Sequence, residues 1–414
     1  MNYITKNDSS YYKTIIALFS GSFVSFMILY SMQTLIPVFS MEFDVTPAVA
    51  SLALSVTTGF LAVTMLIAAT VSDSTGRKRM MTLALIISSI LCILSAFSTS
   101  YTSLLFIRVL QGIALAGFPS IAMTYVSEEF HPKTLGVVMG IYVSGTTLGG
   151  LSGRLVTGVL TDWFSWQIAL LVIGGISVFL SVLFWMLLPV DVHSKRTKYS
   201  LKQLWPSLLY NLKDRKLLGL YTISFVLMGG FVTVYNYISF VLMAPPYFLS
   251  QTLIGLVFLI YLVGTFSSTY MGRVSDQYGK QTMLPLTILI MLVGTLLTLS
   301  ESLWLLLLAL AIFTFGFFGS HSIASSMVGE LATNYKSQAA SLYLLCYYLG
   351  SSVIGTSGGV IWENFAWTGI VSTICGLILI ALVMVIMIRV ELRREVRVEG
   401  EMLDKHGETV KRMG

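Results

Sequence analysis

Long apolar segments alternate with short polar connections along almost the whole chain. Each segment is long enough to cross the ~30 Å hydrocarbon core of a bilayer as an α-helix of about 20 residues. Twelve such segments occur, at 14–38, 47–70, 80–97, 103–126, 136–160, 167–188, 217–241, 252–272, 281–299, 303–328, 337–360 and 367–388. The pattern predicts an all-α membrane protein with twelve transmembrane helices.

The longest polar connection follows the sixth apolar segment and divides the chain into two groups of six. It spans 189–216 and contains four leucines at helical spacing, which is typical of an amphipathic helix on the membrane surface. These leucines are Leu201, Leu204, Leu208 and Leu212. We therefore expect an N-terminal six-helix bundle (1–188), a cytoplasmic central loop (189–216), a C-terminal six-helix bundle (217–388) and a basic cytoplasmic tail (389–414).

Short motifs recur about half a chain apart. Three pairs match, at separations of 203, 201 and 205 residues: Asp73 with Asp276, Asp162 with Glu363, and Gly150 with Gly355. A nearly constant separation indicates an internal duplication. Two six-helix halves with a site between them are typical of a transporter.

The composition excludes soluble and disordered proteins. Only 11% of the residues are charged, whereas an ordinary soluble domain is about 25% charged, and disordered chains are polar and charged. The three cysteines lie inside apolar segments, so we expect neither a disulfide nor a metal site. The sequence contains no nucleotide-binding loop, metal-ligand cluster or nucleophile elbow. We therefore expect no enzyme activity, no cofactor and no nucleic-acid partner.

Lys and Arg residues are distributed unevenly over the connections. If the N-terminus is cytoplasmic, 23 of the 25 Lys and Arg residues face the cytoplasm and the outer connections carry only acidic charges. Cytoplasmic connections of membrane proteins are enriched in Lys and Arg. We expect a multi-pass protein of the cytoplasmic membrane with both termini in the cytoplasm. The two remaining arginines, Arg108 and Arg154, lie inside apolar segments.

Two matching loops with a D-x-x-G-[R/K] pattern follow the second and eighth apolar segments. Glycine can supply the positive φ of a tight turn, and aspartate can pair with a helix N-terminus or a nearby cation. The loops predict a cytoplasmic gate that latches the two halves together, and the alternative is an ordinary basic turn. The gate residues are Asp73, Gly76, Arg77, Asp276, Gly279, Lys280 and Glu129.

Both loops resemble the G-x-x-x-D-x-x-G-[R/K] signature of the major facilitator superfamily, with Ala69 for the first glycine of the first copy. The run Arg108-x-x-Gln111-Gly112 resembles that family's R-x-x-Q-G motif. The resemblance covers the whole chain. It implies the major facilitator fold, two pseudo-symmetric six-helix bundles around a central site, and a role for Arg108 near the substrate and proton path. Snorkelling of Arg108 toward the outer interface is the alternative.

Within this family the chain is similar to bacterial drug and sugar efflux permeases, in particular the drug–proton antiporter-like branch. The fifth segment is glycine-rich as in that branch, with Gly149-Gly150 in place of a Gly-Pro pair. The first segment has no acidic residue, which many proton-coupled efflux proteins carry there. The resemblance implies export of a small organic compound in exchange for protons by alternating access.

Seven residues in the apolar segments are candidates for substrate binding or coupling: Arg108, Arg154, Gln33, Tyr30, Asn236, Tyr235 and His321. A membrane arginine is costly and should face a wet cavity or a polar partner. Arg154 matches Gly359 in the second half, so its charge belongs to one half alone. Gln33 and Asn236 occupy matching positions, where they either bind substrate or hold helices together. His321 is either a proton carrier or a neutral side chain bonded to a neighbouring serine.

Two alternatives to export are open. One is proton-coupled uptake of an anionic metabolite that the membrane arginines attract. The other is a lipid flippase or a membrane sensor without net transport. For export and for its alternatives alike, we expect a monomer whose partners are a small molecule, protons and membrane lipids. We expect the basic tail to bind anionic lipid headgroups.

Overall fold

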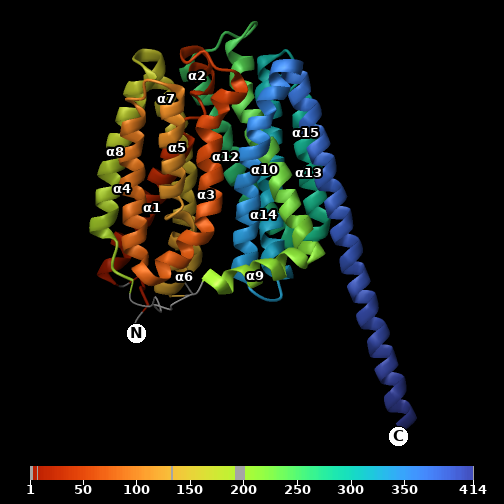
Figure 1. Cartoon of the computed structure of the whole chain (residues 1–414). Coiled ribbons are helices and arrows are strands. Elements are labelled where there is room, and N and C mark those ends of the chain that lie inside the picture. The colour runs from red at the N-terminus through yellow and green to blue at the C-terminus, as the bar shows by residue number, and fades with distance from the viewer. Residues whose placement is uncertain (1–2, 7, 132–133, 192–200, 414) are drawn as a thin grey trace.

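The computed structural model describes residues 3–6, 8–131, 134–191 and 201–413, and the described part is mostly helical (Figure 1). The Asp73 side chain lies outside this description. The first half contains α1 (Ser9–Tyr30), α2 (Ile36–Glu42), α3 (Pro47–Thr75), α4 (Arg77–Ser95), α5 (Tyr101–Leu115), α6 (Pro119–Glu129), α7 (Leu135–Trp163) and α8 (Trp166–Leu187). After α9 (Leu201–Lys213), the second half contains α10 (Arg215–Met243), α11 (Gln251–Val257), the 3-10 turn η1 (Phe258–Ile260), α12 (Tyr261–Tyr278), α13 (Lys280–Leu297), α14 (Leu303–Leu331) and α15 (Lys336–Met413).

The two halves stand side by side, with α9 lying across one end of the bundle (Figure 1). We call this end, where the N-terminus also lies, the proximal end. The opposite end, which carries α2, is the distal end. The predicted amphipathic segment of the central connection corresponds to α9.

Eleven helical stretches of the described residues are long and apolar enough to cross a membrane. The last of them contains two crossings, because the backbone of α15 leaves the helical conformation at Ala366 (φ 49°, ψ −148°). The chain therefore makes twelve crossings, and the predicted all-α fold with twelve spans is confirmed.

Three of the predicted spans are interrupted where we expected continuous helices. The first predicted segment, 14–38, breaks between α1 and α2, the fourth breaks before Pro119, and the eighth contains η1. Proline lacks a backbone N–H and its ring clashes with the preceding turn, which explains the break before Pro119. The break at 31–35 is the important one for the site, because it holds Gln33 in a buried turn.

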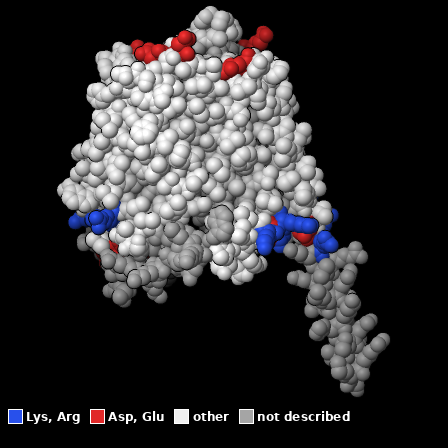
Figure 2. All heavy atoms as spheres, viewed as in Figure 1, with Lys and Arg blue, Asp and Glu red and all other residues white. Residues whose placement is uncertain are grey.

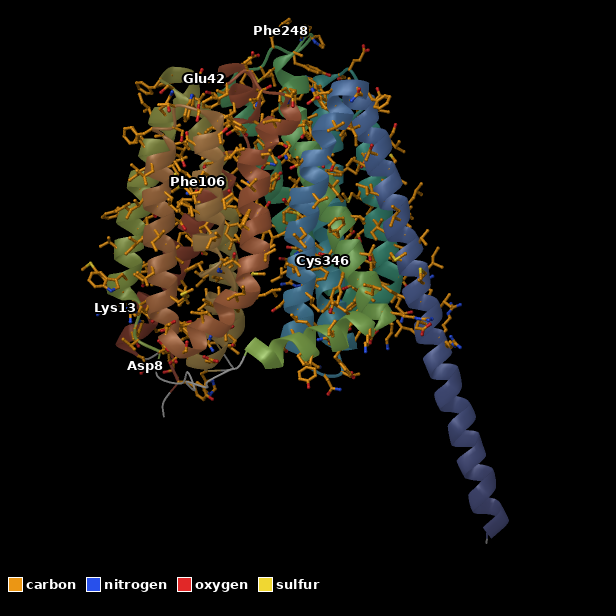
Figure 3. All side chains as sticks on the ribbon, viewed as in Figure 1. Asp8, Lys13, Glu42, Phe106, Phe248 and Cys346 are labelled. Carbon is orange, nitrogen blue, oxygen red and sulfur yellow. The ribbon has the colours of Figure 1, made fainter. Side chains whose placement is uncertain are left out.

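Lys and Arg side chains gather at the proximal end together with some acidic ones, acidic side chains gather at the distal end, and a broad uncharged band lies between the two ends (Figure 2). Glu42 lies at the distal end, whereas Asp8 and Lys13 lie at the proximal end (Figure 3). An uncharged band between two charged ends is the surface that a membrane-spanning bundle needs.

Close packing of α7 on α1 positions the centre of the first half. A Cβ added at Gly153 would lie 3.1 Å from the Met27 Cα atom, so the two backbones meet without intervening side chains. Small residues permit this close approach between membrane helices. As a result Arg154, the next residue of α7, is held beside the turn that follows α1.

Candidate functional site

Arg154 lies at the junction between the two halves, and its side chain is only 2% exposed. The Nε and Nη2 atoms donate hydrogen bonds to Gln33 Oε1 at 2.8 and 2.7 Å. Nη1 donates to the Gly150 carbonyl at 2.9 Å. Two donors of the guanidinium thus converge on a neutral amide oxygen, in a place where arginine more often meets a carboxylate.

Three aromatic rings surround the same guanidinium. Arg154 Cζ lies 4.2 Å from the ring centroid of Tyr30, 4.9 Å from that of Phe258 and 4.5 Å from that of Tyr261. The Tyr261 hydroxyl also accepts a 3.4 Å hydrogen bond from Nη2. At these distances the rings stabilise a cation through their negative faces. Tyr30 was predicted from sequence, whereas Phe258 and Tyr261 were not, because nothing distinguishes them from other aromatic residues of the eighth span.

A second amide extends the network across to the other half. Gln33 Nε2 donates to Asn236 Oδ1 at 2.9 Å, and both side chains are fully buried. Asn236 Nδ2 and Ser55 Oγ are buried, and neither has a hydrogen-bond partner among the residues that the structure describes. Both atoms lie near Gly355, since a Cβ added there would lie 3.6 Å from Asn236 Nδ2 and 3.7 Å from Ser55 Oγ. Gln33 and Asn236, which sequence reasoning placed at matching positions, therefore contact each other directly.

Tyr235 belongs to an aromatic cluster on the second-half side of Arg154. Its hydroxyl forms a 2.7 Å hydrogen bond with Thr314, and its ring centroid lies 4.7 Å from that of Tyr261. We define the aromatic cluster by its linked rings, which are those of Phe231, Tyr235, Phe258, Tyr261, Phe317 and Phe318. The cluster gives the site an aromatic, apolar wall beside the guanidinium.

Arg108 lies inside the first half, apart from the Arg154 network. Its side chain is fully buried, which excludes snorkelling in this structure. Nε donates to the Ala53 carbonyl at 2.7 Å, Nη2 donates to the Leu29 carbonyl at 3.3 Å, and Nη1 donates to Gln111 Oε1. The acceptors come from α3, α1 and α5, so this guanidinium holds three helices of one half together.

His321 lies in α14 and is linked to the aromatic cluster. Its Nδ1 atom lies 3.0 Å from the Tyr343 hydroxyl. The ring is 4.6 Å from the Tyr347 ring and stacks on Phe317 at 6.1 Å. The hydroxyl partner is thus a tyrosine of α15 rather than a neighbouring serine, which corrects the sequence-based expectation. The separation in sequence made Tyr343 impossible to identify from local pattern.

At the distal end, a carboxylate of each half accepts hydrogen bonds from the first turn of a helix in the other half. Asp162 of α7 accepts from the backbone N–H groups of Gln251 (3.0 Å) and Thr252 (2.6 Å), at the start of α11. Glu363 of α15 accepts from the N–H of Ala48 (3.3 Å), at the start of α3. The first N–H groups of a helix have no intrahelical partner and attract negative charge. We call this pair of contacts the distal gate.

Two glycines let the helices touch beside the distal gate. A Cβ added at Gly158 would lie 2.5 Å from the Gln251 carbonyl oxygen, and one added at Gly359 would lie 2.5 Å from the Ala48 nitrogen. At Gly140, nearer the proximal end of α7, an added Cβ would meet nothing within 4 Å. The distal end is therefore closed by direct contact between the halves, one helical turn above Arg154.

The proximal loops both turn at a glycine with positive φ. The φ values of Gly76 and Gly279 are 94° and 87°, a region that residues with a Cβ rarely occupy. In both halves the next helix begins at the following residue. The predicted gate residue Glu129 is 3% exposed, and the side chain of Asp73 lies outside the described part of the chain.

The ion pairs described at these loops connect helices of the same half. Arg77 Nε lies 2.6 Å from Glu128 Oε2 and joins α4 to α6. Lys280 contacts Glu330 and lies 3.7 Å from Asp276, joining α13 to α14 and α12. A latch between the halves, as predicted for these loops, would require the halves to move relative to this structure.

Comparison with known proteins identifies the family. The Major Facilitator Superfamily model matches residues 18–251 and 226–408. The chain is 46% identical over 382 residues to the MFS-type transporter YybF of Bacillus subtilis (strain 168), covering 92% of this chain and 95% of that protein. It is 42% identical over 380 residues to the inner membrane transport protein YnfM of Escherichia coli (strain K12), covering 92% and 91%.

A solved structure supports the same fold. A bacterial homologue of the human lysosomal transporter Spinster, in its inward-facing and occupied conformation, superposes with a TM-score of 0.75 at 14% identity, covering 94% of this chain and 98% of that chain. The family model, the two relatives and the twelve crossings agree. The chain therefore belongs to the major facilitator superfamily and is a multi-pass membrane transporter, not an enzyme.

Proposed function

We propose that the protein is a secondary active transporter that exports a small organic compound in exchange for protons by alternating access. The observation that carries this proposal is the buried link from Arg154 through Gln33 to Asn236, which joins the two halves. In two-repeat transporters the substrate binds at the interface between the repeats. A charged and polar network at that interface has the position and the chemistry of a substrate site.

The distal gate and the proximal loops would form the two barriers of the transport cycle. The distal gate is closed here, so the next state of the cycle has to break the contacts of Asp162 and Glu363. The same movement would bring the loops of Arg77 and Lys280 against the opposite half. Substrate would then reach Arg154 from one side of the membrane at a time.

His321 is our candidate for the proton carrier. Histidine side chains inside membrane proteins take part in proton relays, so His321 would load and release a proton within the cycle. Its stacking on Phe317 connects it to the aromatic cluster beside Arg154. Gain of a proton at His321 would add a second positive charge to the same interface. The added charge would change the relative stability of the states with the distal gate closed and open.

The orientation of the chain in the proposed cycle comes from its charge distribution. Lys and Arg residues gather at the proximal end (Figure 2), and the cytoplasmic side of membrane proteins is the Lys- and Arg-rich side. We therefore infer that both termini are cytoplasmic and that the closed distal gate faces outward. In this orientation the substrate loads from the cytoplasm, as export requires.

Flux measurements in membrane vesicles test the proposal. A compound is first selected by growth of a deletion strain and an overexpressing strain across a panel. We expect inside-out vesicles to accumulate this compound when their lumen is acidic, and to stop when the pH gradient is collapsed. Accumulation in right-side-out vesicles with an acidic exterior would instead establish uptake. Movement of labelled lipid without flux of any soluble compound would establish a flippase.

One observation favours proton-coupled uptake of an anion as a second candidate. Arg154 forms no ion pair with a carboxylate among the described residues. An anion that enters with a proton crosses the membrane without net charge, so the inside-negative potential does not oppose it. The vesicle experiment separates this candidate from export by the sign of the flux.

A further inference from the structure

The Arg154 site contains a buried charge with no opposite charge. Every acceptor that the guanidinium contacts is neutral: an amide oxygen, a backbone carbonyl and a tyrosine hydroxyl. At the proximal surface, by comparison, Arg77 is paired with the carboxylate of Glu128. A buried charge without a counter-charge is unfavourable. An anion is therefore the ligand that would gain most from entering this site.

The hydrogen bonds of the network fix the orientation of both amides. Arg154 donates twice to Gln33, so the amide oxygen of Gln33 must face the guanidinium and its Nε2 must face Asn236. Asn236 must then present its oxygen to Gln33, which leaves its Nδ2 pointing away from the network. Nδ2 is buried and has no partner. Because an arginine carries five N–H donors and no acceptor, and Asn236 Nδ2 adds a further N–H donor without a partner among the described residues, the network has donors to offer an anion.

The wall of the site favours a flat organic body. Tyr30, Phe258 and Tyr261 enclose the guanidinium, and the aromatic cluster continues from Tyr261 to Phe231 at 5.3 Å. Aromatic faces pack well on other flat groups. A small inorganic anion would satisfy the donors and leave this wall without a contact.

We propose that the site binds a small, flat organic carboxylate. The carboxylate takes the place of Gln33 as the two-point partner of Arg154. Asn236, released from Gln33 Nε2, turns its amide so that Nδ2 donates to the carboxylate. The organic body lies against the aromatic cluster. This inference rests on the proposed function, because it names the class of compound that the transporter carries. It assigns no such role to Arg108, whose donors already have acceptors from three helices of one half.

Ligand-induced stabilisation of the purified full-length protein in lipid nanodiscs tests the proposal. The probes are benzoate, cinnamate, the neutral amide benzamide, the cation benzylammonium and chloride. We expect the two carboxylates to raise the unfolding temperature in a saturable way, and the other three probes to leave it unchanged. The apparent Kd for benzoate should weaken by at least about tenfold in R154Q, because a charge-assisted two-point contact is lost.

Three further variants make the result specific. R154K keeps the charge but not the two-point geometry, so it should bind benzoate with an affinity between those of wild type and R154Q. N236A should weaken binding by about tenfold, since it removes one hydrogen bond to a charged carboxylate. R393Q removes an exposed arginine of α15 and should bind as wild type does.

Several results would overturn the carboxylate class. They are equal stabilisation by benzamide or benzylammonium, equal stabilisation by chloride, no stabilisation by either carboxylate, and unchanged benzoate binding in a folded R154Q protein. Vesicle flux distinguishes this failure from failure of the proposed function. Proton-driven export of a neutral compound, without carboxylate binding, would reject the class and leave the export cycle intact. Carboxylate binding without flux in either direction would support the site and reject the cycle.

Discussion

The distal gate and the central site lie about two helical turns apart but differ in symmetry. At the gate, each half contributes one carboxylate and receives one from the other half. Asp162 and Glu363 are related by the internal repeat, and so are the helix starts that they contact, at Gln251 and Ala48. The same device therefore occurs twice, once at each side of the junction.

The central site is not repeated in this way. Arg154 on α7 corresponds to Gly359 on α15, so one half provides a charge where the other provides room for close packing. Only the amides Gln33 and Asn236 occupy repeat-related positions. Arg154 makes them unequal, because it binds the amide oxygen of Gln33, and the Gln33 Nε2 atom then donates to the amide oxygen of Asn236. The contacts of the distal gate therefore retain the internal repeat. The charge of the central site comes instead from a position at which the two copies differ.

Removal of the asymmetric charge should have the largest effect. We expect R154A to lower transport by about a hundredfold, the order found when one partner of a buried charge contact is truncated. Expression and membrane insertion should stay normal, because the other contacts of α7 remain. Initial rates of flux in vesicles, normalised to protein amount, measure the effect, with R393A as the matched arginine control. Transport at the wild-type rate would make Arg154 a structural residue.

The paired glycines test whether the two sides of the gate are equivalent. G158A and G359A should each shift the population away from the distally closed state by about tenfold, because each Cβ would overlap backbone atoms of the other half. Distances between spin labels at the distal end of α3 and near Ala366 of α15 report the shift. G140A is the control on the same helix. A closed distal end in both variants would show that these glycines are not needed for closure.

Substitution of His321 tests whether this residue of the second half carries the proton. H321Q keeps a hydrogen-bonding side chain opposite Tyr343 but cannot titrate in the physiological range. We expect transport driven by a pH gradient to fall by about fivefold, while substrate exchange without a gradient persists. The readout is the pH profile of flux. An unchanged profile would assign the proton to another group.

Neutralising each of the two carboxylates of the distal gate should shift the closed population by a different amount. Asp162 accepts two N–H groups and Glu363 accepts one at a longer distance. D162N should therefore shift the closed population by about threefold and E363Q by less, since hydrogen bonds to charged groups are worth about twice neutral ones. The same spin-label distances apply, with E42Q as the control acid at that end (Figure 3). A larger shift in E363Q than in D162N would contradict this ranking of the two carboxylates.

Much of the architecture was predictable from the chain because membrane insertion depends on local composition. The length of the apolar segments gives the crossings, and the internal repeats give the two halves. The positive φ at Gly76 and Gly279 was predictable for the same reason, since a tight turn requires it locally. The presence of Arg154 inside an apolar segment was enough to mark it as a candidate.

Only the tertiary structure decided what these residues contact. The chain alone could not show that Gln33 bonds to Asn236, that Phe258 and Tyr261 enclose Arg154, or that Tyr343 faces His321. Nor could it distinguish Arg108, whose acceptors belong to one half, from Arg154, whose neighbours come from both. The physical reason is that crossing a membrane is determined by each segment's own apolar length, whereas a site depends on which faces of distant helices meet when the halves pack.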